Sequence, residues 1–149
     1  MIIKEDLTDI LIDEITPLLE LHRQEISAFP DMVLNIDWDK YYQLQKLKKL
    51  HIFTSRDKET NELLGYLVYI CDKNSHYQDY IYALQDVFYV KKELRGRFMG
   101  VKLLKFSENN LKRLGVAAIM QHMKVDHPFQ KLLVNQGYKM QEYIYSKRL

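Results

Sequence analysis

Apolar residues recur along the chain with two different periods, and the changes between them mark the expected elements. Residues 1–4 form a short apolar run, and residues 50–55, 63–70 and 80–90 are the apolar and aromatic runs typical of strands. The polar segment 57–61 would join two of these runs as a hairpin turn. The pattern therefore predicts one N-terminal strand and, after a helical stretch, three consecutive strands.

Helical spacing separates the first strand from the other three. Asp6 or Thr8 can cap a first helix. Its apolar stripe consists of Leu11, Ile15, Leu18, Leu19 and His22. Because Pro17 lacks an N–H group and lies within this stripe, we expect a kink or a break there. Asp37 can cap a second helix over residues 38–49.

The second half of the chain alternates helix and strand. Residues 100–114 have helical spacing, and Gly115 is suited to end that helix. Strands are expected at residues 116–125 and 138–146, with a short helix at residues 128–136 between them. The predicted order, β-α-α-β-β-β-α-β-α-β, indicates an α/β (α+β) fold with a mixed sheet and one parallel, right-handed crossover.

Composition and charge narrow the class of protein. The 149 residues fit one domain over residues 1–149, and 47% hydrophobic content allows a sizeable core. A net charge of +2, with both signs interspersed, argues against a nucleic-acid binder. No apolar run approaches the roughly 18–20 residues that cross a bilayer. Cys71, the single cysteine, fits a reducing, cytoplasmic setting, and the histidines show no zinc-ligand spacing.

The strongest local signal for function lies between the strand that ends near residue 90 and the helix that begins near residue 100. A helix N-terminus exposes backbone N–H groups and partial positive charge, which together favour an anion. Gly96 and Gly100 would let a ligand approach the backbone, and Arg95 and Arg97 add positive charge. The turn alone is equally consistent with an arginine-rich turn capped by solvent.

The order of the elements, with this turn after the fourth strand, resembles the GNAT superfamily of N-acetyltransferases along nearly the whole chain. The family's pyrophosphate motif, Gln/Arg-x-x-Gly-x-Gly/Ala, corresponds here to Arg95-x-x-Phe98-x-Gly100, so Phe98 replaces the central glycine. Phe98 still has a backbone amide, and the site is retained if its φ stays negative. The resemblance implies acetyl-CoA as cosubstrate, no metal, and a CoA site formed by Val90, Arg95, Gly96, Arg97, Phe98, Met99, Gly100, Val101 and Lys102.

Shorter stretches resemble a small, mostly phage-encoded group within this superfamily. They are residues 37–41, 65–66, 76–77, 86–90, 122–124 and 146–149. The superfamily resemblance implies a mostly antiparallel central sheet with splayed parallel fourth and fifth strands, flanked by helices. The narrower resemblance implies that the protein works in the cytoplasm of a host.

Transfer of an acyl group to an amine requires a base for the amine, a polarised thioester carbonyl and a stabilised thiolate. By the resemblance, Asp86 on the fourth strand is the first candidate base, since several family members hold a carboxylate there. We expect desolvation in an apolar strand to favour proton uptake by Asp86. The alternative is a structural Asp86 that accepts hydrogen bonds from a loop.

His122 is the second catalytic candidate. Period two places His122, Lys124 and Asp126 on one face of the predicted fifth strand. If the fourth and fifth strands splay, His122 would face Asp86 and could act as base, acid or proton shuttle. The alternatives are a half-buried structural histidine and a Lys124 that pairs with an acid instead of contacting substrate.

The tyrosine that commonly protonates the thiolate in this family is missing. Counting four residues back from Gly137 gives Leu133. His122 or Tyr138 could serve instead, or the thiolate could leave without an acid, because an ordinary thiol has a pKa near ~8.5. A protein that binds acyl-CoA without efficient catalysis is the remaining interpretation.

The acceptor is the least determined part of the sequence reading. In this family the acceptor side is formed by the first two helices and their connection, where acids and aromatic rings together would suit an ammonium group. The residues of these types here are His22, Asp31, Asp37, Trp38, Asp39, Tyr41 and Tyr42. The alternative is an ordinary amphipathic helix with a solvated acidic start. His76 and Tyr77 precede the fourth strand and could either close over the substrate or lie in a solvated loop. We therefore expect transfer to a small amine or a protein lysine, or else a non-catalytic interaction protein. A homodimer through the last strand is a further expectation.

Overall fold

A five-stranded sheet, in the order β1-β2-β3-β4-β5, forms the centre of the molecule. The structure, a computed structural model, describes residues 1–149 except for the side chains of Asp9 and Ile10. The strands are β1 (Ile2–Asp6), β2 (Leu50–Arg56), β3 (Leu63–Lys73), β4 (Ile81–Val90) and β5 (Val116–Met120). Neighbouring strands are antiparallel except for the parallel pair β4 and β5, which confirms the mixed sheet.

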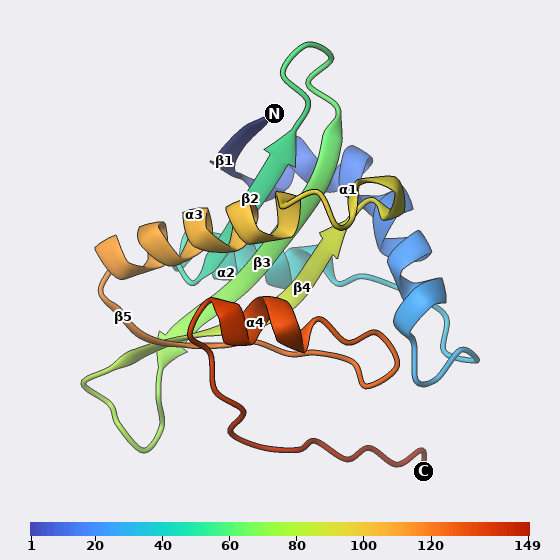
Figure 1. Cartoon of the computed structure of the whole chain (residues 1–149). Helices are drawn as coiled ribbons and strands as arrows, with labels where there is room; N and C mark the ends of the chain where they lie inside the picture. The colour runs from blue at the N-terminus through green and yellow to red at the C-terminus, as the bar shows by residue number, and fades with distance from the viewer.

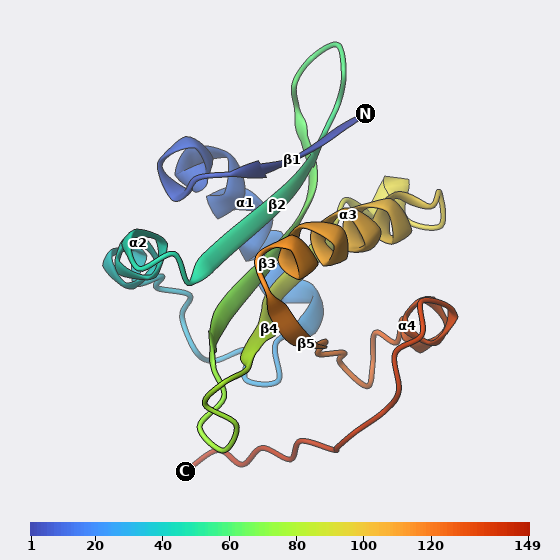
Figure 2. The same ribbon diagram turned by 90° about the vertical axis from the view of Figure 1, so that its left-hand side faces the viewer.

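Helices cover both faces of this sheet and give three layers (Figures 1 and 2). They are α1 (Thr8–Ile26), α2 (Trp38–Lys46), α3 (Met99–Arg113) and α4 (Gln130–Asn135), with a short 3-10 helix η1 (Lys92–Leu94) before α3. Figure 2, which views the sheet near its edge, places α1 and α2 on one side and α3 and α4 on the other. Of the helices described, none combines the length and the apolar character that a membrane span requires.

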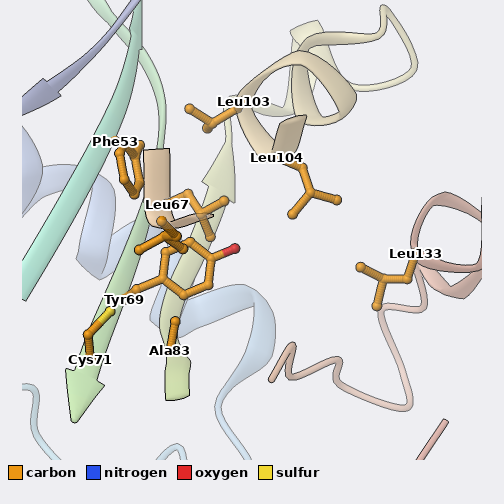
Figure 3. Packing of buried hydrophobic residues seen from close by; sticks show 9 residues of the cluster. Phe53, Leu67, Tyr69, Cys71, Ala83, Leu103, Leu104 and Leu133 are labelled. Atoms are coloured by element: carbon orange, nitrogen blue, oxygen red, sulfur yellow. The ribbon is translucent and has the colours of Figure 1, made fainter. Parts of the chain in front are cut away.

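Alternating residues of β2 and β3 fill two hydrophobic layers. Leu67 and Tyr69 pack against Leu103 and Leu104 of α3, as Figure 3 shows. The intervening Tyr66 and Val68 point to the opposite face and pack against Leu11 and Ile15 of α1. Period two along the strands therefore explains why one sheet supports helices on both sides.

A buried ionic cluster, not foreseen from the sequence, ties β1, β2 and α1 together. Arg56 is 1% exposed, and it donates to Asp6 at 3.1 Å and to the Glu14 carboxylate at 2.9 and 2.5 Å. The Thr54 hydroxyl donates to Asp6 at 2.8 Å. Burial alone would raise the pKa of Asp6, but hydrogen bonds from Lys4, Thr54 and Arg56 together hold this pKa below its usual value. Mutual pairing allows these charges to be buried.

A bulge interrupts β4 in its middle. Val68 of β3 pairs with Val87, whereas the next residue, Tyr69, pairs with Gln85. Asp86 is therefore an extra residue that has no partner across the ladder. Bulges of this kind bend a strand and redirect side chains, and they are frequent beside functional sites.

The bulge also reverses which faces the β4 side chains occupy. Before it, Ala83 packs on the α3 side of the sheet, and after it Phe88 does so. Val87 and Tyr89, which regular alternation would place with Ala83, pack instead on the α1 side. In the sequence, the polar pair Gln85 and Asp86 interrupts an otherwise apolar and aromatic run, but it does not indicate a change of face.

The N-terminal helix differs from expectation at its start and in its middle. Neither Asp6 nor Thr8 caps it: Asp6 ends β1, and the Thr8 N–H donates to Gln45 of α2 at 2.7 Å. The helix also continues unbroken through Pro17. Pro17 is exposed, so water can bind the carbonyl that loses its N–H partner. The cap of α2 is as predicted, since Asp37 accepts from the N–H of Lys40 at 3.0 Å.

The predicted last strand is absent from the structure. Tyr143, Ile144 and Tyr145 carry its apolar character, yet they are 76%, 73% and 92% exposed. Residues 138–149 run beyond α4 without entering the sheet that the structure describes (Figure 1). β-propensity alone does not make a strand without a neighbouring strand to pair with. The homodimer that we expected through this segment stays a prediction.

Candidate functional site

The two parallel strands separate at the β4 bulge. Their pairing ends where Leu84 meets Met120, so β5 stops five residues short of the predicted end at residue 125. Beyond that point the N–H of His122 donates to the Gln85 side chain at 3.1 Å rather than to the β4 backbone. The splayed fourth and fifth strands that the resemblance implied are therefore present, and they part beside Asp86.

Asp86 is exposed and is held from the α2 side. The Tyr41 hydroxyl donates to the Asp86 Oδ2 atom at 2.6 Å. Burial and then the Asp86 carboxylate raise the pKa of Tyr41, so this tyrosine remains a neutral donor. The desolvation that we expected for Asp86 is wrong, because a bulged residue is turned out of the strand's packed faces. Two residues named separately from the sequence are nevertheless brought together.

A pocket of about 180 Å³ adjoins Asp86 on the side of the sheet covered by α1 and α2. Its walls come from both helices, from the connection between them and from three strands. They are formed by Thr8, Leu11, Ile15, Leu19, Leu34, Ile36, Trp38, Tyr41, Ile52, Tyr66, Val68, Asp86 and Val87. Sequence reasoning had named only Trp38, Tyr41 and Asp86 as site candidates, since contacts between distant elements leave no local pattern.

The turn before α3 presents free backbone donors. The first N–H bound within the helix is that of Lys102, which donates to the Phe98 carbonyl at 3.0 Å. The N–H groups of residues 99–101 therefore have no partner inside α3. Gly100 lets the helix start close to β4 and α4, since a Cβ there would lie 3.4 Å from both Phe88 and Leu132. The helix dipole adds to the attraction for an anion at this end.

The basic residues of this turn have different roles. Arg95 donates to the Val90 carbonyl at 2.9 Å and pairs with Glu25 at 2.9 Å, so it anchors the turn to β4 and α1. Arg97 and Lys102 are exposed, and among the described residues neither has an acidic partner. These two side chains are the ones available to an anionic ligand.

Phe98 has a left-handed backbone conformation. Its φ is 59°, and its side chain is 73% exposed. The condition of a negative φ is therefore not met at Phe98, and the free donors of the turn are the N–H groups of residues 99–101. A residue with a Cβ loses about 1–2 kcal/mol in this conformation, which glycine adopts readily. The geometry of the turn accordingly suits the glycine that the family motif has at this position.

We expect Phe98→Gly to stabilise the fold by about 0.5–1 kcal/mol, because relief of backbone strain outweighs the greater unfolded-state entropy of glycine. Urea denaturation of the two proteins measures the difference. Phe98→Ala is the matched control, since it removes the exposed ring but keeps the Cβ. Equal stability of the glycine and alanine variants would contradict the strain argument.

His122 and Lys124 were predicted to share one face of an extended fifth strand, but they lie beyond the end of β5. His122 and Lys124 follow the end of β5 and are exposed, so period two does not place them on a common face. Among the described contacts, His122 has no hydrogen bond to Asp86. Since these residues lie where β4 and β5 separate, no ladder partner is present to keep them extended.

The loop between β3 and β4 lies at the other end of β4 from the α3 turn. The N–H groups of His76 and Tyr77 both donate to Asn74, at 2.9 and 3.2 Å. Six residues of extended chain between Tyr80 and Asp86 span about 20 Å. His76 and Tyr77 are therefore not brought to Asp86 or to the pocket, and nothing in their contacts assigns them a role.

Of the two alternative acids for the thiolate, Tyr138 is engaged in a contact and His122 is exposed. Leu133, at the position of the missing tyrosine, is buried against α3. Tyr138 donates to Glu108 at 2.7 Å, and burial raises its pKa. Burial also raises the pKa of the Cys71 thiol to about 12, which removes Cys71 as a nucleophile.

Comparison with known proteins identifies the fold. No protein-family model and no curated protein sequence matches this chain. Among solved structures, the chain is similar to a ribosomal-protein-alanine N-acetyltransferase from Brucella melitensis biovar Abortus 2308, with a TM-score of 0.73, 15% identity and 100% of both chains covered. A glucosamine-6-phosphate N-acetyltransferase from Arabidopsis thaliana matches with a TM-score of 0.73 and 13% identity over 99% of both chains.

A third similar structure shows how far this fold is shared. A transcriptional regulator from Bacillus halodurans C-125 matches with a TM-score of 0.75 and 15% identity over 99% of both chains. At these identities the likeness establishes the fold and leaves the activity to be argued from the site. The fold is that of acetyltransferases, as the sequence resemblance implied.

Proposed function

We propose that this protein transfers an acetyl group from acetyl-CoA to a primary amine. The observation that carries the proposal is the parting of β4 and β5 at the bulged Asp86, with the free N-terminus of α3 at the far end of β4. Along β4 this arrangement offers a carboxylate at the bulge, unpaired backbone groups where the two strands separate, and an anion site at the start of α3. The shared fold with acetyltransferases of different acceptors supports it.

The chain's own residues suit the parts of acetyl-CoA. The amides of residues 99–101, with Arg97 and Lys102, would hold the pyrophosphate. Where β4 and β5 separate, their facing backbone groups are free to pair with the amide groups of the pantetheine arm. The Val90 carbonyl is taken by Arg95, so Arg95 would stabilise the turn and not contact the ligand. Acetyl-CoA supplies the activated acyl group.

The proposed acetyl transfer takes place beside the β4 bulge. Asp86 accepts the proton of the attacking amine while Tyr41, bound to its Oδ2 atom, fixes the carboxylate. A backbone N–H at the bulge lies outside the ladder and can donate to the thioester oxygen. The amine nitrogen bonds to the carbonyl carbon, the carbon–sulfur bond breaks, and CoA leaves as the thiolate. His122 is the second candidate for moving a proton.

We expect Arg97→Glu/Lys102→Glu to weaken acetyl-CoA binding by about tenfold or more, because two charge-assisted contacts become repulsive. Isothermal titration calorimetry measures the affinity. Lys112→Glu/Arg113→Glu is the matched control, since it makes the same charge change at the opposite end of α3 and should leave the affinity unaltered. Wild-type protein without affinity for acetyl-CoA would overturn the proposed function.

A second candidate function, of a different class, is a non-catalytic acyl-CoA-binding or interaction protein. Leu133 in the core and the engagement of Tyr138 by Glu108 favour it, since neither residue offers an acid for the thiolate. Release of free thiol from acetyl-CoA with a panel of amines separates the two functions. A phage origin, a host-cytoplasmic location and a single-domain organisation stay predictions.

A further inference from the structure

The pocket beside Asp86 has walls that are almost wholly apolar. Thr8 and Tyr66 contribute to the lining, but these residues are only 1% and 0% exposed, and their hydroxyl oxygens are buried. An occupant therefore meets carbon atoms over nearly all of its surface, and polar contacts are confined to the end of the pocket at Asp86.

The charge of the pocket limits what that occupant is. Among the described residues that line it, Asp86 alone is charged, and its carboxylate stands where the pocket meets the separated strands. Trp38 and Tyr41, whose ring centroids are 5.8 Å apart, also line the pocket, and the Tyr41 hydroxyl donates to Asp86. A carboxylate next to aromatic faces attracts an ammonium group and repels an anion.

The remaining walls limit the occupant's body. Side chains such as Leu11, Ile15, Val68 and Val87 form them and offer no polar partner. A sugar or a polyamine would lose hydrogen bonds to water there without replacement. The volume of about 180 Å³ is comparable with an apolar cavity of about 150 Å³ that admits benzene. One small ring or branched alkyl group therefore fits.

We infer that the acceptor is a primary amine on a compact apolar body, such as an arylmethylamine or a short branched alkylamine. Its body occupies the pocket between α1, α2 and the sheet, and its ammonium group pairs with Asp86. This inference rests on the proposed acetyl transfer, for which it names the acceptor. Amino sugars and free polyamines are excluded as good acceptors.

The chain carries its own probe of this pocket. Trp38, the only tryptophan of the sequence, lines it. We expect benzylamine, added to the full chain without acetyl-CoA, to change the tryptophan fluorescence in a saturable way. Benzyl alcohol, which has the ring but no charge, should bind about tenfold more weakly because the charge-assisted contact to Asp86 is lost. Glucosamine, which has the charge but a polar body, should give no saturable change.

Variants test where the amine binds. Val68→Phe fills the pocket and should weaken benzylamine binding by about tenfold or more. Because an enlarged core residue can prevent folding, Ile36→Lys, on the connection before α2, is a second variant that places a repelling charge in the wall. Leu114→Lys, at an exposed site after α3, is the matched control and should bind benzylamine normally. Acetyl-CoA affinity should be equal in all folded variants.

The outcomes separate this inference from the function on which it rests. Saturable benzylamine binding that Ile36→Lys abolishes supports the pocket even if acetyl-CoA fails to bind, in which case only the proposed function falls. Acetyl-CoA turnover with glucosamine, combined with no fluorescence response to benzylamine, overturns the inference and leaves the function standing. A response to octanoyl-CoA but not to benzylamine would assign the pocket to a long acyl chain and equally overturn it.

Discussion

Replacing Asp86 by asparagine is expected to lower the turnover number by about 100-fold or more, because the proposed general base is lost. Asparagine keeps the size of the side chain and an oxygen for the Tyr41 hydroxyl, which now donates to the carboxylate at 2.6 Å. Asp86 is an exposed, bulged residue, so the change should cost little stability. Release of free thiol under saturating acetyl-CoA and amine measures the turnover.

Two comparisons make the Asp86 experiment specific. The affinity for acetyl-CoA, whose proposed pyrophosphate site is at the start of α3, should be unchanged in Asp86→Asn. Tyr41→Phe removes one hydrogen bond but keeps the carboxylate, so its turnover should fall by no more than about tenfold. Full activity of Asp86→Asn at neutral pH would remove Asp86 from the mechanism and leave His122 as the remaining candidate.

Replacing Arg56 by methionine is expected to lower the free energy of unfolding by about 3–5 kcal/mol, the usual result of breaking one side of a buried ion pair. Methionine has a similar length, so the change leaves Asp6, whose side chain is 3% exposed, without its buried partner. Glu14 is 38% exposed and can be solvated instead. Urea denaturation, followed by circular dichroism, measures the loss.

Arg23→Met is the matched control for Arg56. Arg23 pairs with Glu20 one turn away on the surface of α1, so its loss should cost less than about 1 kcal/mol. A stability of Arg56→Met close to that of Arg23→Met would show that the buried cluster contributes little to folding.

The same cluster predicts how stability depends on pH. Hydrogen bonds from Lys4, Thr54 and Arg56 lower the pKa of Asp6 against the opposing effect of burial, and the hydrogen bond from Arg56 is the main cause that lowers the pKa of Glu14. Carboxylates of this kind stabilise the fold above their ordinary pKa values, 3.8 and 4.5, and the stabilisation is lost as pH falls. Wild-type stability should therefore decline below about pH 4 more steeply than that of Arg56→Met.

The order of elements up to Gly115 could be predicted because each carries a local signal. Asp37 caps α2, Gly115 has a φ of 83° after α3, and β2 to β4 are rich in apolar and aromatic residues. The end of β5 and the final strand could not, because residues 121–125 and 138–146 have strand propensity but no partner strand. Propensity describes the segment, whereas a strand also requires its neighbour.

The candidate site was predictable only in part, for a similar reason. Asp86 was predicted as a candidate base because it is a carboxylate on the fourth strand, and Tyr41 as a substrate contact because it is aromatic. Their hydrogen bond joins residues 45 positions apart and depends on how α2 packs against the sheet. The buried hydroxyl of Tyr66 is equally a product of packing. Arg56 lies just beyond the predicted strand 50–55, and nothing in the local sequence indicates that it is the centre of a buried cluster. The sequence states the chemical type of each residue, whereas its burial and its hydrogen-bond partners depend on contacts between segments far apart in the chain.

The extra residue in β4 has a consequence for how this protein tolerates insertions and deletions. Gln85 and Val87 already pair with successive residues of β3, so loss of residue 86 would close the ladder into regular alternation and shift no register. Val87 and Tyr89 would stay in the α1 layer, and Phe88 would stay on the α3 side. Substitution and deletion at position 86 would therefore both remove the carboxylate and spare the fold, and deletion would in addition remove the bulge beside which β4 and β5 separate.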